Sequence, residues 1–247
     1  CVNIFVVSPF ADDNFLWPYL SKILVAIELR FNEFIEFTEG QIKNMEAVIA
    51  TGSNNTARYF DYYFSKYPSI IRKNRNSVAV LTGKETTQEL KELGKDVFQY
   101  FGLGCRNVSK LFVPRGYKFD LFYEAIIGYQ DVIHMNKYGN NYDYNRTVYL
   151  MSTDTTLLDN NFLLLKESNS YSSPIGVLFY EYYDDVEQLN VRLEKDAAEI
   201  QCIVSAKGAV KNSIPFGQAQ CPGLNDYADG IDTMRFLTGL QNEVVAK

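Results

Sequence analysis

The sequence predicts an α/β fold built on an open sheet, and two observations lead to this prediction. Segments with strand patterns alternate with segments of helical pattern along the 247 residues, an order typical of α/β proteins. The apolar strand pattern at 47–50 also runs directly into Thr51-Gly52-Ser53 and then into a helical pattern, which is how an open α/β sheet is built. Hydrophobic residues make up 47% and charged residues 22%, a balance that indicates a folded globular chain.

The first part of the chain has four strand patterns and two helical patterns. Tyr19, Ile23 and Ile27 recur at four-residue spacing, so a helix is predicted at 14–29. The other elements expected here are strands at 2–7, 34–38, 47–50 and 77–81 and a helix that follows Ser53.

The second part begins with an amphipathic helix at 85–101, in which Leu90, Leu93 and Val97 share one face. A glycine-rich turn separates this helix from the strand expected at 110–114. The remaining expected elements are helices at 119–131, 137–151 and 184–197 and strands at 161–166, 175–182 and 200–204. We divide the chain near residue 82, into α/β parts of residues 1–82 and 83–247.

Composition excludes several classes of protein. The net charge of −6 and the pI near 5.0 argue against a nucleic-acid binder, which usually has a basic face. No apolar run approaches the length of about 18 residues that a transmembrane helix needs, and the start of the chain lacks the basic flank of a secretory signal. We therefore expect a cytoplasmic protein. The chain begins within a strand pattern and without Met, so we also expect that a segment precedes it in the complete protein.

The cysteines give the first chemical indication. There are four of them: Cys1, Cys105, Cys202 and Cys221. They form no CxxC pair and have no histidine at metal-binding spacing, so neither a metal site nor a disulfide framework is expected. Cys105 follows Gly104 in a Gly-x-Gly-Cys turn, where backbone N–H groups can bind an oxyanion when a thiolate attacks a carbonyl. Arg106 would favour that thiolate. The alternative is a small hydrophobic residue in a tight turn.

Two other positions also have two interpretations each. The turn Thr51-Gly52-Ser53 at a helix N-terminus can hold a phosphate or contact a nicotinamide, or it can be a plain connection with Ser53 or Asn54 as the helix cap. His134 is the only histidine. It can act as an acid or base, or it can be a structural residue near a helix start.

Basic clusters and a late loop complete the candidate residues. The clusters are Arg72-Lys73-Asn74-Arg75 and the pair Arg106 and Lys110. Each can hold a phosphate or can be solvated surface charge. A tight loop is expected at Phe216-Gly217-Gln218, ahead of Cys221 and Pro222.

Taken together, these motifs resemble the aldehyde dehydrogenase superfamily in order and spacing over essentially the whole chain. The turn at Thr51 resembles its cofactor-side Thr-Gly-Ser turn, and Gly102-Leu103-Gly104-Cys105 resembles its nucleophile loop. Within the superfamily the sequence is most similar to the acyl-CoA reductases related to the fatty-acid reductase of bacterial bioluminescence. The strings that carry this similarity are 50–60, 71–80, 101–110 and 216–221.

The resemblance implies a partial Rossmann-type nucleotide-binding domain at 1–82 and an α/β catalytic domain at 83–247. It implies that Cys105 takes an acyl group from acyl-CoA and that NADPH (or NADH) reduces the acyl-enzyme to an aldehyde. Thr51, Gly52 and Ser53 would then contact the cofactor, Gly104 and Arg106 the oxyanion, and Phe216, Gly217 and Gln218 the mouth of the active site. A homodimer is also implied.

The sequence departs from ordinary aldehyde dehydrogenases where they carry a water-activating glutamate. The matching segment, Arg72-Lys73-Asn74-Arg75-Asn76, contains no glutamate. Losing that base would protect the thioester from water and favour reduction or transfer. The glutamate expected to hold the nicotinamide ribose likewise has no counterpart among residues 170–173. Two alternatives therefore stay open: a cysteine-based acyl transferase or thioesterase without hydride transfer, and an inactive oligomerisation partner.

Overall fold

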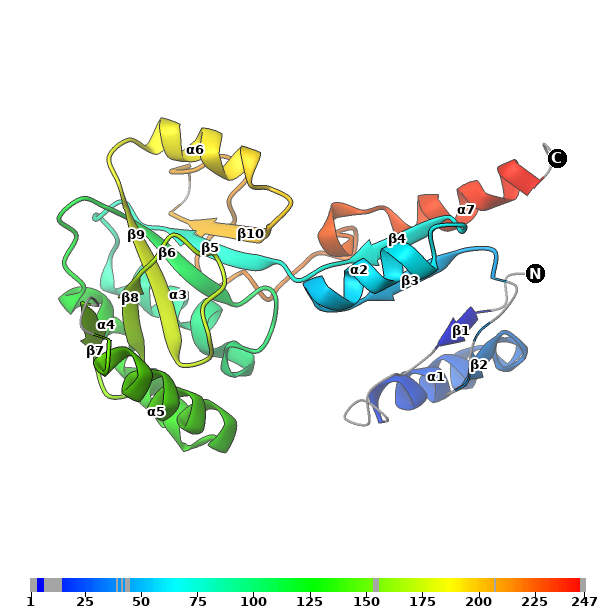
Figure 1. The fold of residues 1–247 in the computed structure, drawn as a ribbon, viewed down its shortest axis with the longest axis horizontal. Coiled ribbons are helices and arrows are strands. Elements are labelled where there is room, and N and C mark those ends of the chain that lie inside the picture. Colours follow the sequence, from blue (N-terminus) through cyan, green and yellow to red (C-terminus); the bar gives the residue numbers. More distant parts are fainter. Residues whose placement is uncertain are drawn as a thin grey trace.

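The protein is described by a computed structural model at residues 4–6, 15–38, 40, 42, 45–152, 156–206 and 208–244. The largest sheet has six strands. Figure 1 shows this sheet with its helices on one side of the molecule and smaller strand pairs on the other. The strands of the large sheet are, in order across it, β10 (Ile200–Ser205), β5 (Asn76–Val80), β6 (Val108–Pro114), β9 (Val177–Tyr183), β8 (Leu164–Glu167) and β7 (Leu157–Asp159). The α/β fold class is thus confirmed.

The large sheet is parallel except at one edge, where β7 runs antiparallel to β8. Parallel sheets need cover on both faces, and their strands accordingly read as continuous apolar runs. Ala79 and Leu111 pack with one helical layer, formed by α3 (Thr87–Phe98), α4 (Asp120–Ile126) and α5 (Asn136–Leu150). Val78 and Phe112 point the other way, against α6 (Val186–Lys195). The alternation of side chains along each strand thereby builds two cores.

Two small parallel strand pairs precede the large sheet. β1 (Ile4–Val6) pairs with β2 (Ile35–Phe37), and β3 (Val48–Thr51) pairs with β4 (Ser69–Arg72). Helix α1 (Leu16–Ile27) lies between the first two strands in sequence and α2 (Asn54–Tyr63) between the second two. Residues 2, 3 and 7 of the strand expected at 2–7 lie outside the described residues, as does Cys1 before it.

Several element boundaries differ from the sequence prediction. The helix expected at 85–101 ends at Phe98, because Tyr100 and Phe101 adopt positive φ angles of 55° and 58°. The helix expected at 119–131 ends at Ile126 and continues as a tighter 3₁₀ segment, in which Gly128 weakens an α-helix. β4, β7 and the C-terminal helix α7 (Thr233–Val244) were not predicted.

The domain division near residue 82 stays a prediction. In the described structure β5, which precedes residue 82, pairs with both β6 and β10, which follow it. Among the described helices, none combines the length and the apolar character needed to cross a membrane.

Candidate active site

The turn that carries Cys105 is organised by Asn107. The Asn107 amide nitrogen donates to the carbonyl groups of Asp96, Val97 and Gln99 at the end of α3, at 3.1, 3.2 and 2.7 Å. Its amide oxygen accepts a 2.8 Å hydrogen bond from the Gly104 N–H. One buried side chain therefore ends the helix and shapes the loop that presents Cys105 as an exposed residue.

This arrangement decides which backbone N–H groups near Cys105 are available to a ligand. The Gly104 N–H is already used by Asn107, so Gly104 shapes the turn and does not have a free donor. Within the described part of the chain, the N–H groups of Cys105 and Arg106 have no hydrogen-bond acceptor. These two donors, and not the one of Gly104, are the ones open to an oxyanion.

Arg106 connects the Cys105 turn to the loop at 215–221. Its Nε donates a short hydrogen bond to the carbonyl group of Ala219. Asp96, only 1% exposed, holds the same loop by accepting hydrogen bonds from the N–H groups of Gly217 and Ala219, at 2.6 and 2.9 Å. Burial raises the pKa of Asp96 to about 6, although both hydrogen bonds lower it. The loop is thus fixed from the α3 side and from the side of the Cys105 turn.

The loop residues divide between core and surface. Phe216 is buried in the main core, and Gln218 is exposed. Gly217 has a φ of 80°, and a Cβ atom there would lie 2.6 Å from Oε2 of Glu92. A side chain at Gly217 would therefore be strained by the backbone conformation and would crowd the Glu92 side chain. Cys221, in the same loop, is exposed.

A cavity of about 260 Å³ lies at Cys105. The turn that carries Cys105 forms one wall, and the segment Ser172–Val177 forms another. The lining residues are Asn74, Arg75, Asn76, Val97, Gly102–Cys105, Asn107–Ser109, Tyr138, Leu163 and Ser172–Val177. This set of described residues contains no carboxylate and no histidine.

A buried serine links Cys105 to a second thiol. Ser77 is fully buried, and its hydroxyl donates a 3.0 Å hydrogen bond to the carbonyl group of Cys105. The Cys202 thiol donates to the same hydroxyl at 3.1 Å. Burial raises the pKa of Cys202, which packs against the core.

The other predicted site residues lie elsewhere. His134 is exposed at the end of the 3₁₀ segment and does not line the cavity at Cys105. Ser53 caps α2, its hydroxyl accepting from the Thr56 N–H at 3.2 Å. Gly52 lies so close to Thr56 that a Cβ atom would approach that side chain to 2.9 Å. This turn does not line the cavity either.

The basic clusters are largely paired within the chain. Arg72 and Arg75 approach Asp229 to 3.8 and 3.6 Å, and Lys73 approaches Asp61 to 3.2 Å. Lys110 was expected to be either a phosphate ligand or solvated surface charge, and both expectations are wrong. Its side chain is fully buried and forms an ion pair with Glu181, because strand β6 turns this position into the layer under α6.

Sequence reasoning missed three residues that build the site: Asn107, Asp96 and Ser77. Signals existed for two of them. An Asn two residues after a cysteine in a glycine-rich turn commonly bonds nearby backbone groups. Asp96 is a charged residue next to Val97 on the apolar face of its helix, so it needed a polar partner. Ser77 had no signal, since its partners come from distant segments.

Similarity to known proteins is found at the level of structure. No family model and no curated protein matches the sequence. A putative aldehyde dehydrogenase, PutA from Anabaena variabilis, matches 90% of this chain with a TM-score of 0.62 and 13% identity. AldA, an indole-3-acetaldehyde dehydrogenase of P. syringae solved with NAD+, matches 73% with 0.54 and 11%. An NAD-dependent aldehyde dehydrogenase from Sinorhizobium meliloti matches 76% with 0.54 and 9%.

The chain therefore has the fold of aldehyde dehydrogenases. It spans 58% of the length of the Anabaena protein and 46% and 47% of the other two. At these identities the similarity defines the architecture and leaves the chemistry to be argued from the residues of this chain.

Proposed function

We propose that this chain is the nucleophile-bearing part of an oxidoreductase that reduces an acyl-CoA thioester to an aldehyde, with Cys105 as the residue that takes the acyl group. The observation that carries the proposal is the exposed Cys105 thiol, held in an Asn107-organised turn beside a cavity. The aldehyde dehydrogenase fold supports it. The sequence resemblance to acyl-CoA reductases supplies the substrate class.

In the proposed reaction the Cys105 thiolate attacks the thioester carbonyl carbon, and a C–S bond forms. The oxyanion that develops would be stabilised by the Cys105 and Arg106 N–H groups, which have no acceptor in the described structure. The tetrahedral adduct collapses when the bond to the CoA sulfur breaks, so CoA leaves as a thiolate and the acyl group stays on Cys105.

The lining of the cavity favours an acyl group that stays on Cys105 over one that is hydrolysed. Activation of a water molecule requires a nearby base, and no carboxylate or histidine is found among the described lining residues. The acyl-enzyme would therefore persist until it is reduced or transferred.

The turn at Thr51–Ser53 has features that fit a nicotinamide cofactor, NADPH or NADH. The first-turn N–H groups of Asn54 and Asn55 have no acceptor among the described residues, and Thr51 and Ser53 are exposed beside them. Such free N–H groups at a helix start bind anionic groups. When bound, the cofactor supplies the hydride that reduces the acyl group. A cytoplasmic homodimer remains the expected setting.

A second candidate, an acyl transferase that uses Cys105 without hydride transfer, is favoured by one observation. Residues 51–53 do not line the cavity at Cys105, so the proposed cofactor turn is not part of the same enclosure. The two candidates share the acyl-enzyme and differ only in the fate of its acyl group.

The test is intact mass after mixing the protein with acyl-CoAs of increasing chain length. We expect a gain of one acyl group in the protein and in Cys221→Ala, a matched control that removes another exposed thiol, and none in Cys105→Ala. No adduct on the unaltered protein, with Cys105 still open to iodoacetamide, would contradict the proposal. Adding NADPH separates the candidates: release of aldehyde with loss of the adduct supports the reductase, and an unchanged adduct supports the transferase.

A further inference from the structure

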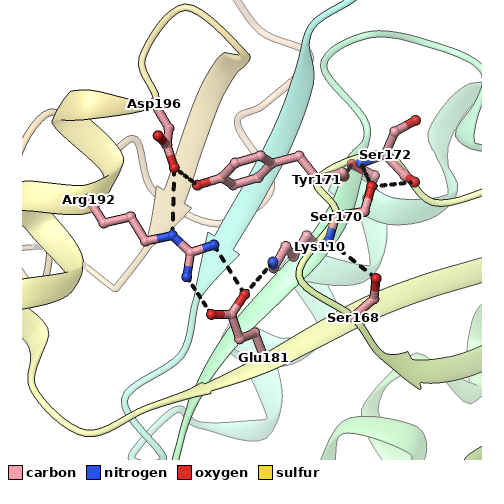
Figure 2. Close-up of polar contacts among 9 residues, drawn as sticks. Lys110, Ser168, Ser170, Tyr171, Ser172, Glu181, Arg192 and Asp196 are labelled. Atoms are coloured by element: carbon pink, nitrogen blue, oxygen red, sulfur yellow. Dashed lines mark hydrogen bonds and ion pairs between the residues drawn. The ribbon is translucent and has the colours of Figure 1, made fainter. Parts of the chain in front are cut away.

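A network of charges lies under α6, on the far side of β6 from the main core. Lys110 is fully buried and binds Glu181, which also accepts hydrogen bonds from Arg192 (Figure 2). Arg192 in turn approaches Asp196 to 3.6 Å. The Tyr171 hydroxyl donates a 2.6 Å hydrogen bond to Asp196, and the Tyr171 ring lies 5.1 Å from the Lys110 ammonium. Tyr171 is thus held at both its hydroxyl and its ring.

In this network, burial and the hydrogen bonds between charged side chains act on the pKa values in opposite directions. Burial lowers the pKa of Lys110, against the hydrogen bond to Glu181 that raises it. The pKa of Glu181 stays below its usual value because hydrogen bonds from Arg192 and Lys110 outweigh the opposing effect of burial. Buried ion pairs of this kind add little net stability compared with apolar side chains of similar size. What the network gives this protein is a fixed geometry around Tyr171.

Tyr171 belongs to the segment that connects β8 to β9, and this segment includes one wall of the Cys105 cavity. Every residue from Ser172 to Val177 lines that cavity. The carbonyl group of Tyr171 accepts a 2.7 Å hydrogen bond from the hydroxyl of Ser109, itself a lining residue. Tyr171 therefore connects the charge network on one side of the sheet to the cavity wall.

The first half of the connecting segment is attached to the sheet at its start, where the Ser168 N–H donates a 3.0 Å hydrogen bond to the Tyr180 carbonyl group, and has mostly local hydrogen bonds after that. The N–H groups of Ser170 and Ser172 bond to the hydroxyls of Ser168 and Ser170. Bonds of this kind stiffen the segment without attaching it to the sheet. Between Ser168 and the Asn145 side chain, which donates to the Ile175 carbonyl group at 3.2 Å, the attachment comes from Tyr171, through Ser109 at its backbone and through Asp196 at its hydroxyl.

We propose that Tyr171 is a positioning residue: anchored by Asp196 and by its packing on Lys110, it holds the Ser172–Val177 wall at the place that sets the width of the Cys105 cavity. The wall, and with it the size of group that reaches the thiol, is thus controlled by a network that itself touches no substrate. This proposal depends on the proposed function only for the chemical identity of the group that reaches the Cys105 thiol.

The test compares how fast a small and a bulky reagent, iodoacetamide and a fluorescein maleimide, alkylate Cys105. The readout is peptide mass, with the exposed Cys221 as an internal reference. Tyr171→Phe removes the bond to Asp196 and keeps the ring. We expect it to raise the bulky-to-small rate ratio at Cys105 at least about three-fold and to speed amide hydrogen exchange at 168–176. Tyr183→Phe is the matched control, because it removes a 2.8 Å hydrogen bond to the Leu81 carbonyl outside the cavity; it should leave both readouts unchanged.

A second variant keeps the proposal falsifiable if Tyr171→Phe folds poorly. Asp196→Ala removes the same hydrogen bond from the half-buried end of α6. It should reproduce the effect, and the double variant should add nothing to it, because both changes break one attachment. Unchanged rate ratios and unchanged exchange in either single variant would overturn the proposal. Neither readout uses acyl-CoA or a nucleotide, so failure of the acylation test leaves this outcome independent.

Discussion

Replacing Asp96 by asparagine should change how the stability of this protein depends on pH. Asp96 is almost fully buried, and it accepts the N–H groups of Gly217 and Ala219. An asparagine at this position would keep the size of the side chain and remove its titration. Its NH2 group would face one of the two backbone N–H groups, a cost that does not depend on pH. The pH dependence of the stability difference therefore isolates the effect of burying this one charge under the loop at 215–221.

The size of the effect comes from the pKa of Asp96, which burial raises from 3.8 to about 6. Between these values the folded protein keeps a proton that the unfolded chain has lost, so the free energy of unfolding falls as the pH rises through the window. A gap of two pKa units corresponds to a loss of about 3 kcal/mol, complete slightly above pH 6. Asp96→Asn lacks this loss, and about half a kcal/mol of it is already present at pH 4, so the stability of the variant relative to the natural protein should rise by about 2 kcal/mol between pH 4 and pH 7.

The measurement is urea unfolding of both proteins at several values of pH from 4 to 7.5, and the quantity of interest is the difference between them. The contributions of the other carboxylates to the pH dependence are the same in both proteins and cancel in that difference. Asp143→Asn, at an exposed position, is the control and should run parallel to the natural protein. If the Asp96→Asn difference is also flat across this range, the buried charge is not linked to stability and the reasoning fails.

Three further substitutions test other contacts. Asn107→Ala removes the bonds to the end of α3 and to the turn, so we expect a loss of about 2–4 kcal/mol in urea unfolding and slower acylation of Cys105 by mass spectrometry. Gly217→Ala should cost about 1–3 kcal/mol for its positive φ, and Glu92→Ala in the same chain should recover only the part due to the close contact. Lys110→Met leaves Glu181 with one cation fewer and should cost about 3–5 kcal/mol in the same unfolding measurement.

Controls for these substitutions come from exposed positions. Asn140→Ala, on the exposed face of α5, and Lys84→Met, before α3, should leave the unfolding free energy nearly unchanged. Equal losses in the exposed and the buried variants would mean that the buried contacts do not determine stability. If Glu92→Ala restored all of the unfolding free energy lost in Gly217→Ala, backbone strain at Gly217 would be absent.

The sequence was sufficient to predict the elements with long apolar patterns. The strand Val78-Ala79-Val80 and the helix with Leu90 and Leu93 are both found close to their expected places, because burial on a sheet imposes these periodicities. β4 and β7 escaped prediction for the opposite reason. In each of them only two adjacent apolar residues, Ile70-Ile71 and Leu157-Leu158, stand between polar ones, which is too few for a strand pattern.

The site was harder to predict than the fold. Cys105 was predicted to be a nucleophile from the local sequence, and that role stays a prediction; the structure places the residue beside a cavity. The partners of its turn are Ser77, on a neighbouring strand, and Ala219, more than a hundred residues further along the chain. Lys110 was misread because a lysine in an apolar strand is buried only when a distant residue, here Glu181, neutralises it. Such pairings depend on the tertiary structure and leave no local pattern.

The link that Asn107 makes between α3 and the Cys105 turn has a consequence for how the protein opens. Local unfolding proceeds in cooperative units, and groups joined by buried hydrogen bonds open together. The amide of Gly104, bonded to Asn107, should therefore exchange with solvent at the rate of the last turn of α3 and not at the faster rate of a surface loop. The turn that carries Cys105 would then open only as often as α3, a helix that begins with a capping box at Thr86. Removing that distant cap would therefore make the turn that carries Cys105 unfold locally more often.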